Sequence, residues 1–169
     1  MFSSDLVTTL ANEHVALAQL FARHQEALVS RAWARAARLL EHYRRRLQYH
    51  IQLEERYLLP YCLKDQLPGK WPCDTFMTEH RRLEELLRKT SVRLAMARQH
   101  GVTTDMLIAL LDAEKTYKHL VRDHYQREEV AMFAVLRESL PDNARAGLVQ
   151  LLLQQQHTAD VAMVGSVRY

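Results

Sequence analysis

The chain has 169 residues, 48% of them hydrophobic and 25% charged, which is the balance of a soluble protein long enough to bury one core. A net charge of +3 is too small to indicate nucleic acid as a partner, and no apolar run approaches the roughly 18 residues of a membrane span. The N-terminus lacks the basic region of a signal peptide, so we expect a cytoplasmic location and no membrane partner.

Glycine and proline, four of each, gather in a few places, and the pattern between them is helical throughout. We predict a first helix over about 4–29, capped by Ser4 or Asp5, and a second over about 32–66. A third helix begins near the sequence PCDTF at 72–76 and ends at about His100, before Gly101. A fourth helix runs from TTD at 103–105 to about Leu140. A shorter helix follows Pro141, and the tail over 159–169 is frayed or packed on the outside.

Apolar residues recur at spacings of three and four along each of the first four helices. Such stripes, joined by short connections, are typical of an all-α, up-down-up-down antiparallel four-helix bundle. We therefore predict this bundle over residues 1–140, with a short extra C-terminal helix and tail over 141–169 packed on the same domain.

Each apolar stripe is interrupted at its middle by imidazole or carboxylate side chains. The six interruptions are His14, His50, Glu54, His80, His124 and Glu128. In an antiparallel pair, residues at one height are equidistant from the turn, and the midpoints between successive interruptions fall near 33, 66 and 103, close to the predicted turns. The six side chains are therefore expected to form one layer. Polar groups facing a core are costly unless partnered, so the layer needs a collective explanation.

The spacing inside the two His–Glu pairs favours metal binding. Residues i and i+4 share a helix face, so His50 with Glu54, and His124 with Glu128, can reach neighbouring points of the core. With the two remaining histidines, the layer offers four imidazoles and two carboxylates, which suits two metals bridged by the carboxylates. Iron or manganese fits this mixed set well, and zinc also fits. The ferritin-like alternative requires Glu-x-x-His and isolated glutamates, the reverse of this order.

These residues resemble the hemerythrin family in its bacterial HHE branch. The resemblance spans roughly 4–140 and depends on EH at 13–14, HIQLEERYLLP at 50–60, EHRRLEEL at 79–86 and HYQREEVAMF at 124–133. It implies a pair of iron ions with an oxo or hydroxo bridge that binds dioxygen or reacts with it. By the same resemblance, His14, His50, His80 and His124 are terminal ligands, and Glu54 and Glu128 are bridging ligands.

One position departs from the oxygen carriers of that family, which place a second histidine four residues after the ligand of the third helix. Here that position is Glu84. Glu84 is either an additional metal ligand or a carboxylate outside the ligand shell. Two six-coordinate irons offer about twelve positions, of which four histidines, two bridging glutamates and a bridging oxygen fill about ten. Without Glu84, about two positions are open, which favours redox reaction over simple reversible carriage.

Other residues near the layer have two readings each. Tyr43 and Tyr117 precede the paired histidines by seven residues and point inward, either as core packing or with a hydroxyl aimed at the metal site. The glutamates beside the ligands are either solvated or support a ligand from behind: Glu13, Glu55, Glu79 and Glu129.

The remaining reactive or charged residues are read as structural. His24 lies about 15 Å along its helix from His14 and is expected to be a core or helix-end histidine. Surface or terminal positions are expected for His42, His100, His119 and His157. Cys62 and Cys73 are read as two thiols, with redox pairing as the other reading. The arginines at 31, 35, 38 and 45 form a stripe that is read as a solvated helix face.

The predicted function is a non-haem di-iron protein that binds or reacts with O₂, nitric oxide or peroxide, in oxygen, redox or stress sensing or handling. Two other classes stay open: an enzyme of peroxide breakdown or iron–sulfur cluster repair, and a metal-stabilised interaction module. Relatives that repair iron–sulfur clusters carry an additional cysteine-containing N-terminal domain. We do not recognise such a domain in this sequence, so we favour the repair function less. The expected partners are a small diatomic ligand and, as one option, a second copy of the chain.

Overall fold

The computed structural model describes residues 5–64 and 71–165, apart from the side chains of 63, 64, 73 and 155–165. It is all-helical, with 92% helix and no strand in these two stretches. The predicted fold class is confirmed at this level. The connection over 65–70, which includes the first residues of the predicted turn LPGKWP, lies outside the described residues.

The long helices agree closely with the ranges expected from the sequence. α1 spans Leu6–Val29, α4 spans Cys73–His100 and α5 spans Thr104–Arg127. The second predicted helix is α2 (Trp33–Leu53), continued without a break by a π-helical turn η1 (Glu54–Leu58) and by α3 (Leu59–Lys64). The fourth predicted helix likewise continues from α5 through a π-helical turn η2 (Glu128–Met132) into α6 (Phe133–Ser139).

Local chemistry explains where these helices begin and end. The Asp5 carboxylate accepts a hydrogen bond from the Thr8 amide (3.2 Å), so Asp5 is the N-cap of α1. Thr103 caps α5 in the same way through the Met106 amide. Gly101 ends α4 with a φ of 84°, a conformation that costs glycine little. Capping residues and the one positive-φ glycine therefore fix the boundaries around the α4–α5 turn.

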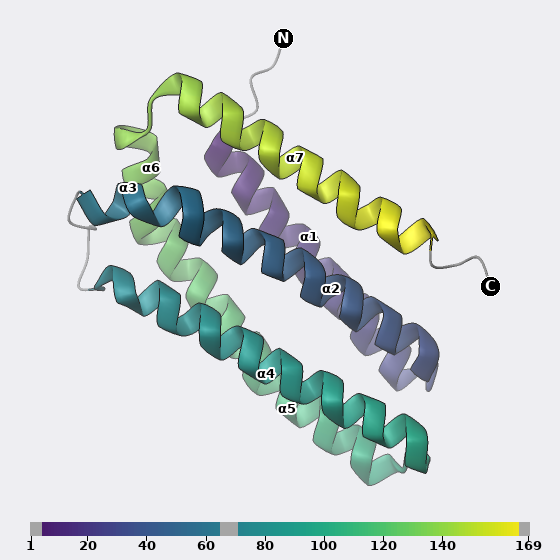
Figure 1. The fold of residues 1–169 in the computed structure, drawn as a ribbon. Helices are drawn as coiled ribbons and strands as arrows, with labels where there is room; N and C mark the ends of the chain where they lie inside the picture. The colour runs from purple at the N-terminus through teal and green to yellow at the C-terminus, as the bar shows by residue number, and fades with distance from the viewer. Residues whose placement is uncertain (1–4, 65–70, 166–169) are drawn as a thin grey trace.

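The helices pack in neighbouring pairs. α1 lies against α2, α4 lies against α5, and α2 contacts α4 across the middle of the molecule (Figure 1). Short turns at 30–32 and 101–103 join the members of each pair, close to two of the three expected turns. The up-down-up-down order of the four long helices stays a prediction.

The C-terminal helix is longer than expected. α7 spans Asp142–Gly165, 24 residues, and packs against α1 and α2 along the upper edge of Figure 1. The prediction of a short helix with a separate tail from 159 was wrong, because no proline follows Pro141 and the only interior glycine before the helix end is Gly147. A single glycine inside a helix costs about 1 kcal/mol relative to alanine, which packing readily offsets.

The apolar core is divided into two clusters by a polar layer. The first core cluster joins the start of α1 to α3, α6 and α7, and includes Leu10, Leu58 and Phe133. The second core cluster joins the rest of α1 to α2, α4 and α5, and includes Leu17 and Leu83. The six polar residues singled out in the sequence fall between these clusters, so apolar packing holds the layer from both sides.

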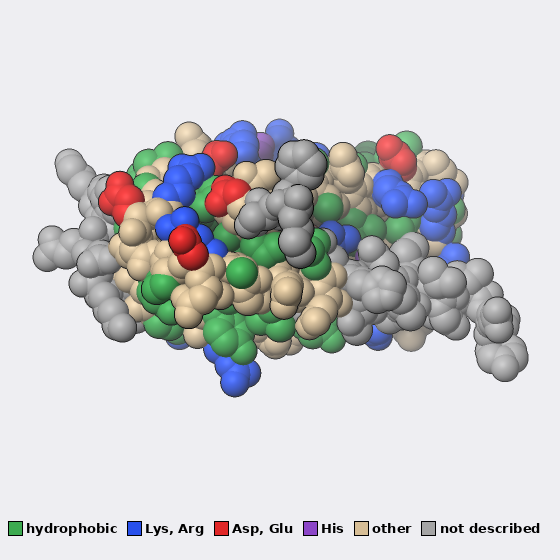
Figure 2. Space-filling view, turned by 90° about the horizontal axis from the view of Figure 1, so that it is seen from above, with side chains coloured by type: hydrophobic (Ala, Val, Ile, Leu, Met, Phe, Trp, Pro, Cys, Tyr) green, Lys and Arg blue, Asp and Glu red, His purple; other side chains and the backbone are tan. Residues whose placement is uncertain are grey.

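The outer surface mixes both signs of charge. In the view of Figure 2, basic and acidic side chains are interspersed, and hydrophobic side chains reach the surface between them. The arginines of the basic stripe, at 31, 35, 38 and 45, are all exposed. Within the described helices, none combines the length and the apolar content that a bilayer crossing requires.

Candidate metal centre

All six predicted ligands meet in one buried layer. α1 contributes His14, α2 contributes His50, and α4 contributes His80. His124 lies in the last turn of α5, one turn before Glu128, as His50 precedes Glu54. The side chains of both glutamates are fully buried, and only 11% of the His14 side chain is exposed. The five other predicted ligands are buried, so His14 is the most exposed member of this layer.

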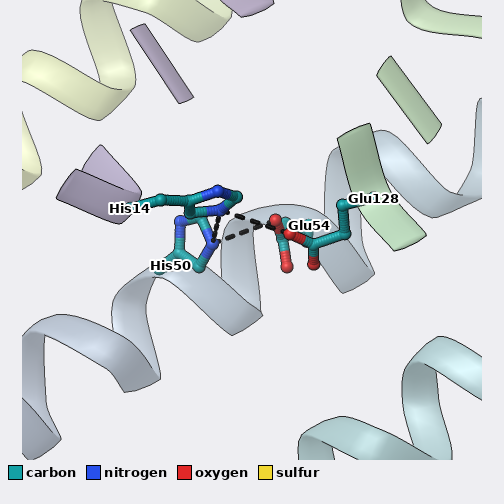
Figure 3. Close-up of side chains that lie close together, drawn as sticks. All are labelled: His14, His50, Glu54 and Glu128. Carbon is teal, nitrogen blue, oxygen red and sulfur yellow. Dashed lines mark hydrogen bonds and ion pairs between the residues drawn. The ribbon is translucent and has the colours of Figure 1, made fainter. Parts of the chain in front are cut away.

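The six residues form two sets of four that share both carboxylates. One set is His14, His50, Glu54 and Glu128, drawn in Figure 3, and the other is Glu54, His80, His124 and Glu128. In each set the potential ligand atoms all lie within 4.8 Å of one another. Each set therefore offers two imidazole nitrogens and two carboxylate oxygens around one point.

Each carboxylate divides its two oxygens between the sets. Glu54 Oε1 lies 3.0 Å from His50 Nε2, and Glu54 Oε2 lies 3.2 Å from His80 Nε2. Glu128 Oε2 lies 3.2 Å from His14 Nε2, and Glu128 Oε1 lies 2.7 Å from His124 Nε2. Both glutamates are thus placed to bridge two ions, the arrangement expected from the paired spacing.

The polar atoms of the layer point toward a common centre, and most of them lack a hydrogen bond to one another. All four oxygens of Glu54 and Glu128, and Nε2 of His80, lack a hydrogen bond of acceptable geometry in the described part of the chain, although charged neighbours are close. His14 Nε2 and His50 Nε2 face each other at 3.0 Å. Buried carboxylates without hydrogen bonds are costly, whereas a cation at each set would satisfy them. The donor set therefore fits two metal ions.

Carboxylates behind the ligands orient two of the imidazoles. His80 Nδ1 donates to Glu55 Oε1, and His124 Nδ1 donates to Glu79 Oε2, both at 2.9 Å. A proton held on Nδ1 leaves the Nε2 lone pair free for a metal. Arg127 in turn pairs with Glu79. Of the two readings for Glu55 and Glu79, the structure places them in contact with the ligands.

The other two neighbouring glutamates differ from this pattern. Glu13 is buried and forms a two-pronged ion pair with Arg46, with N–O distances of 2.6 and 2.7 Å. This pair ties α1 to α2 one residue before His14. Glu129 is exposed, on the rim of a cavity described below.

Without metal, the layer holds its charges as imidazolium and carboxylate. Burial lowers the pKa of His80, but the carboxylates of Glu128 and Glu54 outweigh burial and raise it to about 10. The same opposition raises the pKa of His124 to about 9, with Glu128 as the main partner. Burial raises the pKa of Glu128, but the facing histidines outweigh it and hold that pKa well below its usual value. Metal ions therefore compete with protons for these nitrogens.

Both carboxylates open a π-helical turn, a feature that the sequence analysis did not anticipate. The Glu54 carbonyl accepts from the Leu59 amide, and the Glu128 carbonyl accepts from the Phe133 amide, each five residues on. Such turns frequently occur at functional sites because they insert one residue without ending the helix. The two copies of the motif thus share a backbone distortion as well as residue types.

Tyr125 is a further residue of the site that sequence reasoning missed. Its ring stacks on the His14 imidazole with centroids 3.6 Å apart and an interplanar angle of 3°. Its hydroxyl is buried and has no hydrogen-bond partner among the described residues. Burial raises the pKa of this phenol well above its usual value, and the carboxylates of Glu128 and Glu54 raise it further. Tyr125 is therefore a neutral hydroxyl beside the metal layer.

The tyrosines singled out in the sequence lie elsewhere. The hydroxyls of Tyr43 and Tyr117 pair with each other at 2.8 Å, and both rings pack around Phe21 in the second core cluster. This contact differs from the other reading of these tyrosines, in which a hydroxyl is aimed at the metal site. Core packing describes these two residues.

Glu84 is exposed and belongs to neither set of four. The hydrogen bond to Glu41 raises the pKa of the Arg44 guanidinium, and the nearby charge of Glu84 adds to this effect. Of its two readings, the structure places Glu84 as a surface carboxylate.

Several other expectations meet the structure in different ways. His100 and His119 are exposed as predicted, but His42 is buried, so its surface assignment was wrong. His42 lies on the apolar side of α2, beside Leu39 and Tyr43 in the helix. Cys62 is buried in the first core cluster. The side chains of Cys73 and His157 lie outside the described residues, so cysteine pairing stays a hypothesis.

A second buried His–Glu contact lies in the other half of the molecule. His24 Nδ1 donates to the Ala36 carbonyl, and His24 Nε2 lies 2.8 Å from Glu114 Oε1. Gln25 donates to the other oxygen of Glu114 at 2.9 Å. His24 is a core histidine, as expected. Its partner Glu114 was not identified, although it lies in the same spacing of four and three residues as Leu110 and Tyr117.

Comparison with known families agrees with this geometry. The model of the hemerythrin HHE cation binding domain matches residues 5–95. The chain belongs to this family. No curated protein and no solved structure shows a significant match to the chain.

Membership of the HHE family establishes cation binding as the character of the domain. The matched range contains His14, His50, Glu54 and His80, and it ends before His124 and Glu128. The last two ligands are placed by the structure alone, where they complete both sets of four.

Proposed function

We propose that this chain is a non-haem di-iron protein that binds or reacts with O₂, nitric oxide or peroxide, in the sensing or handling of oxygen or redox stress. The observation that supports it best is that two sets of two imidazoles share both carboxylates within one buried layer. Iron is proposed over manganese or zinc because mixed imidazole and carboxylate ligation with free positions suits a redox-active ion.

The donor count supports binding of an external ligand. Each set would offer one metal ion two imidazole nitrogens and one oxygen from each glutamate, four of the roughly six positions that iron prefers. An oxo or hydroxo bridge, which is part of the proposal, would take one more on each side. One position per metal would then be free, because Glu84 is exposed and belongs to neither set. A bound iron pair would supply redox chemistry toward a small ligand.

The chain's own residues prepare this centre. Glu55 and Glu79 hold protons on Nδ1 of His80 and His124, so that the opposite nitrogens are free to bind metal. Tyr125 stacks its ring on the His14 imidazole and so helps to fix the orientation of that imidazole. The proposal also includes three predictions from the sequence. The four long helices follow an up-down-up-down order, the bundle over 1–140 and the C-terminal segment over 141–169 form one domain, and the protein is cytoplasmic.

Anaerobic loading with ferrous iron tests the proposal. We expect about two irons per chain and, after O₂ is admitted, the charge-transfer absorption of a bridged di-iron centre. His14→Ala and His124→Ala remove one ligand from each set and should lower the iron content. His100→Ala, which replaces an exposed histidine, is the matched control. Equal iron content in all four proteins would refute the site.

Two further measurements separate the functional classes. Steady-state consumption of hydrogen peroxide would favour an enzyme over a binding protein. A change in oligomer size between reduced and oxidised protein would favour a sensor, and would also test whether the chain forms a homodimer. A stable, reversible spectrum with O₂ would count against redox reaction and for carriage.

A further inference from the structure

A large cavity lies between α1 and α5, next to the metal layer but outside it. Its volume is about 680 Å³, within the range of roughly 300–1,000 Å³ that is common for sites of small organic molecules. His14 and Tyr125 line one end, and Gln25 and Lys118 line the other. The eleven residues from His14 to Gln25 correspond to about 16 Å of helix. A diatomic molecule needs only a small part of this space.

The hollow results from the side chains that α1 presents to it. Ala18 and Ala22 are one helical turn apart and therefore lie on one face. Opposite them, α5 presents Val121 and Tyr125. Alanine side chains are too short to fill the space between two helices, so the wall is apolar but the gap is left open. Phe133 continues the apolar wall beside His14.

The charges on the rim differ between the two ends. Lys118 lines the end away from the metal layer, and Arg122, one turn further along α5, lies between Lys118 and Tyr125. Lys118 donates to Gln25 Oε1 at 3.2 Å and keeps two further N–H groups, whereas Arg122 is already paired with Asp123. At the other end the rim carries the exposed carboxylate of Glu129. An anionic group is therefore favoured beside Lys118 and disfavoured beside Glu129.

We propose that this cavity binds a free monocarboxylic acid with an elongated apolar body, of the medium-chain fatty acid class. Its carboxylate lies against Lys118, and its apolar body lies along Ala18, Ala22 and Val121 toward His14. Because Lys118, Ala18, Ala22 and Val121 belong to neither candidate metal set, we expect the site in metal-free and metal-loaded protein alike. The proposal goes beyond the di-iron function and does not require it.

Titration of decanoate into metal-free and iron-loaded protein, followed by calorimetry, tests the proposal. We expect saturable binding of one decanoate per chain in both forms. Lys118→Met should weaken decanoate binding by roughly tenfold or more, the effect of losing one charge-assisted contact, and should leave decanol binding unchanged. Equal binding of decanoate and decyltrimethylammonium, or no effect of Lys118→Met on decanoate, would overturn the proposed head-group site.

A second pair of variants locates the apolar body. Ala18→Phe fills the cavity from α1 and should abolish binding of both decanoate and decanol. Ala95→Phe places the same ring on an exposed position of α4 and should leave both affinities unchanged. Helical circular dichroism checks that both variants fold. Retained binding in folded Ala18→Phe protein, or no saturable binding in the unmodified chain, would refute the site. Iron content, measured separately, reports on the metal centre alone.

Discussion

The buried contact between His24 and Glu114 gives a sharp prediction about stability. The Ala36 carbonyl can only accept, so Nδ1 of His24 carries a proton that it donates there. Nε2 of His24 then shares a hydrogen bond with Glu114 Oε1, and Gln25 donates to the other carboxylate oxygen. Both side chains of the His24–Glu114 pair are completely buried. Each polar atom of this group thus depends on one specific partner.

Two substitutions at Glu114 separate hydrogen bonding from packing. Glutamine is isosteric: its amide N–H can donate to Nε2 of a neutral His24, and its oxygen can still accept from Gln25. We therefore expect Glu114→Gln to cost under about 1 kcal/mol. Leucine fills the volume but leaves Nε2 of His24 buried and unpaired, which costs about 1–3 kcal/mol. For a chain of this size, about 2 kcal/mol corresponds to a fall in Tm of about 4–8 °C.

Urea unfolding of the metal-free variants, followed by helical circular dichroism, measures both free energies of unfolding. The ordering is the test: Glu114→Gln should lie close to the unmodified chain, and Glu114→Leu well below it. Equal losses in the two variants would mean that the ion pair, rather than the hydrogen bonds, stabilises this group, and would refute the reasoning. Exposed Glu84→Leu is a control for replacing a carboxylate by leucine on the surface.

Four further predictions concern the metal layer. The pKa values of His80 and His124 are raised to about 10 and about 9, so the stability that they confer on the metal-free protein is complete below about pH 6.5 and falls as pH rises through 9–10. Urea unfolding midpoints measured against pH check this. A midpoint that rises between pH 9 and 10 would contradict it. For the same reason, metal binding at neutral pH should release roughly two protons per chain, measurable by calorimetry in buffers of different ionisation enthalpy. Tyr125→Phe removes a buried hydroxyl without a partner in the described residues, so the metal-free variant should be as stable as the unmodified chain or more so; a loss above about 1 kcal/mol would reveal a partner. Glu79→Ala should weaken metal binding by about 10–100-fold in a chelator competition, because His124 Nδ1 loses its acceptor, whereas exposed Glu84→Ala should not weaken it.

The convergence of the six polar residues could be predicted from the sequence because they break a regular pattern. His50 and Glu54 interrupt an apolar stripe, and a charged pair in a core position demands a partner. Tyr125 gave no such signal: it directly follows His124, outside the spacing that identified the layer, and only the position of α1 brings His14 beneath its ring. Glu114 lies on the apolar face of the predicted fourth helix. The neighbouring Ala113 also fits the apolar stripe, so the spacing alone did not identify Glu114.

The length of α7 and the π-helical turns have different causes from the ligand pattern. α7 packs against α1 and α2, and tertiary packing extends a helix whose own sequence signals are weak. No glycine or proline lies within either π turn, although Pro60 follows η1 in α3. Both turns begin at the glutamate of the motif, so the recurrence of HxQxEE is the sequence feature that they share.

The π turns also explain how one layer can be both polar and rigid. Each inserts a residue just after the ligand pair, so the helix can present Glu54 or Glu128 to the layer and then Leu58 or Phe133 to the first core cluster. The second core cluster packs against the other side of the layer. Each carboxylate is therefore held between two apolar clusters, and its negative charge is balanced by the facing histidines, whose pKa values are raised. Side chains ordered in this way lose little conformational entropy when they bind a cation.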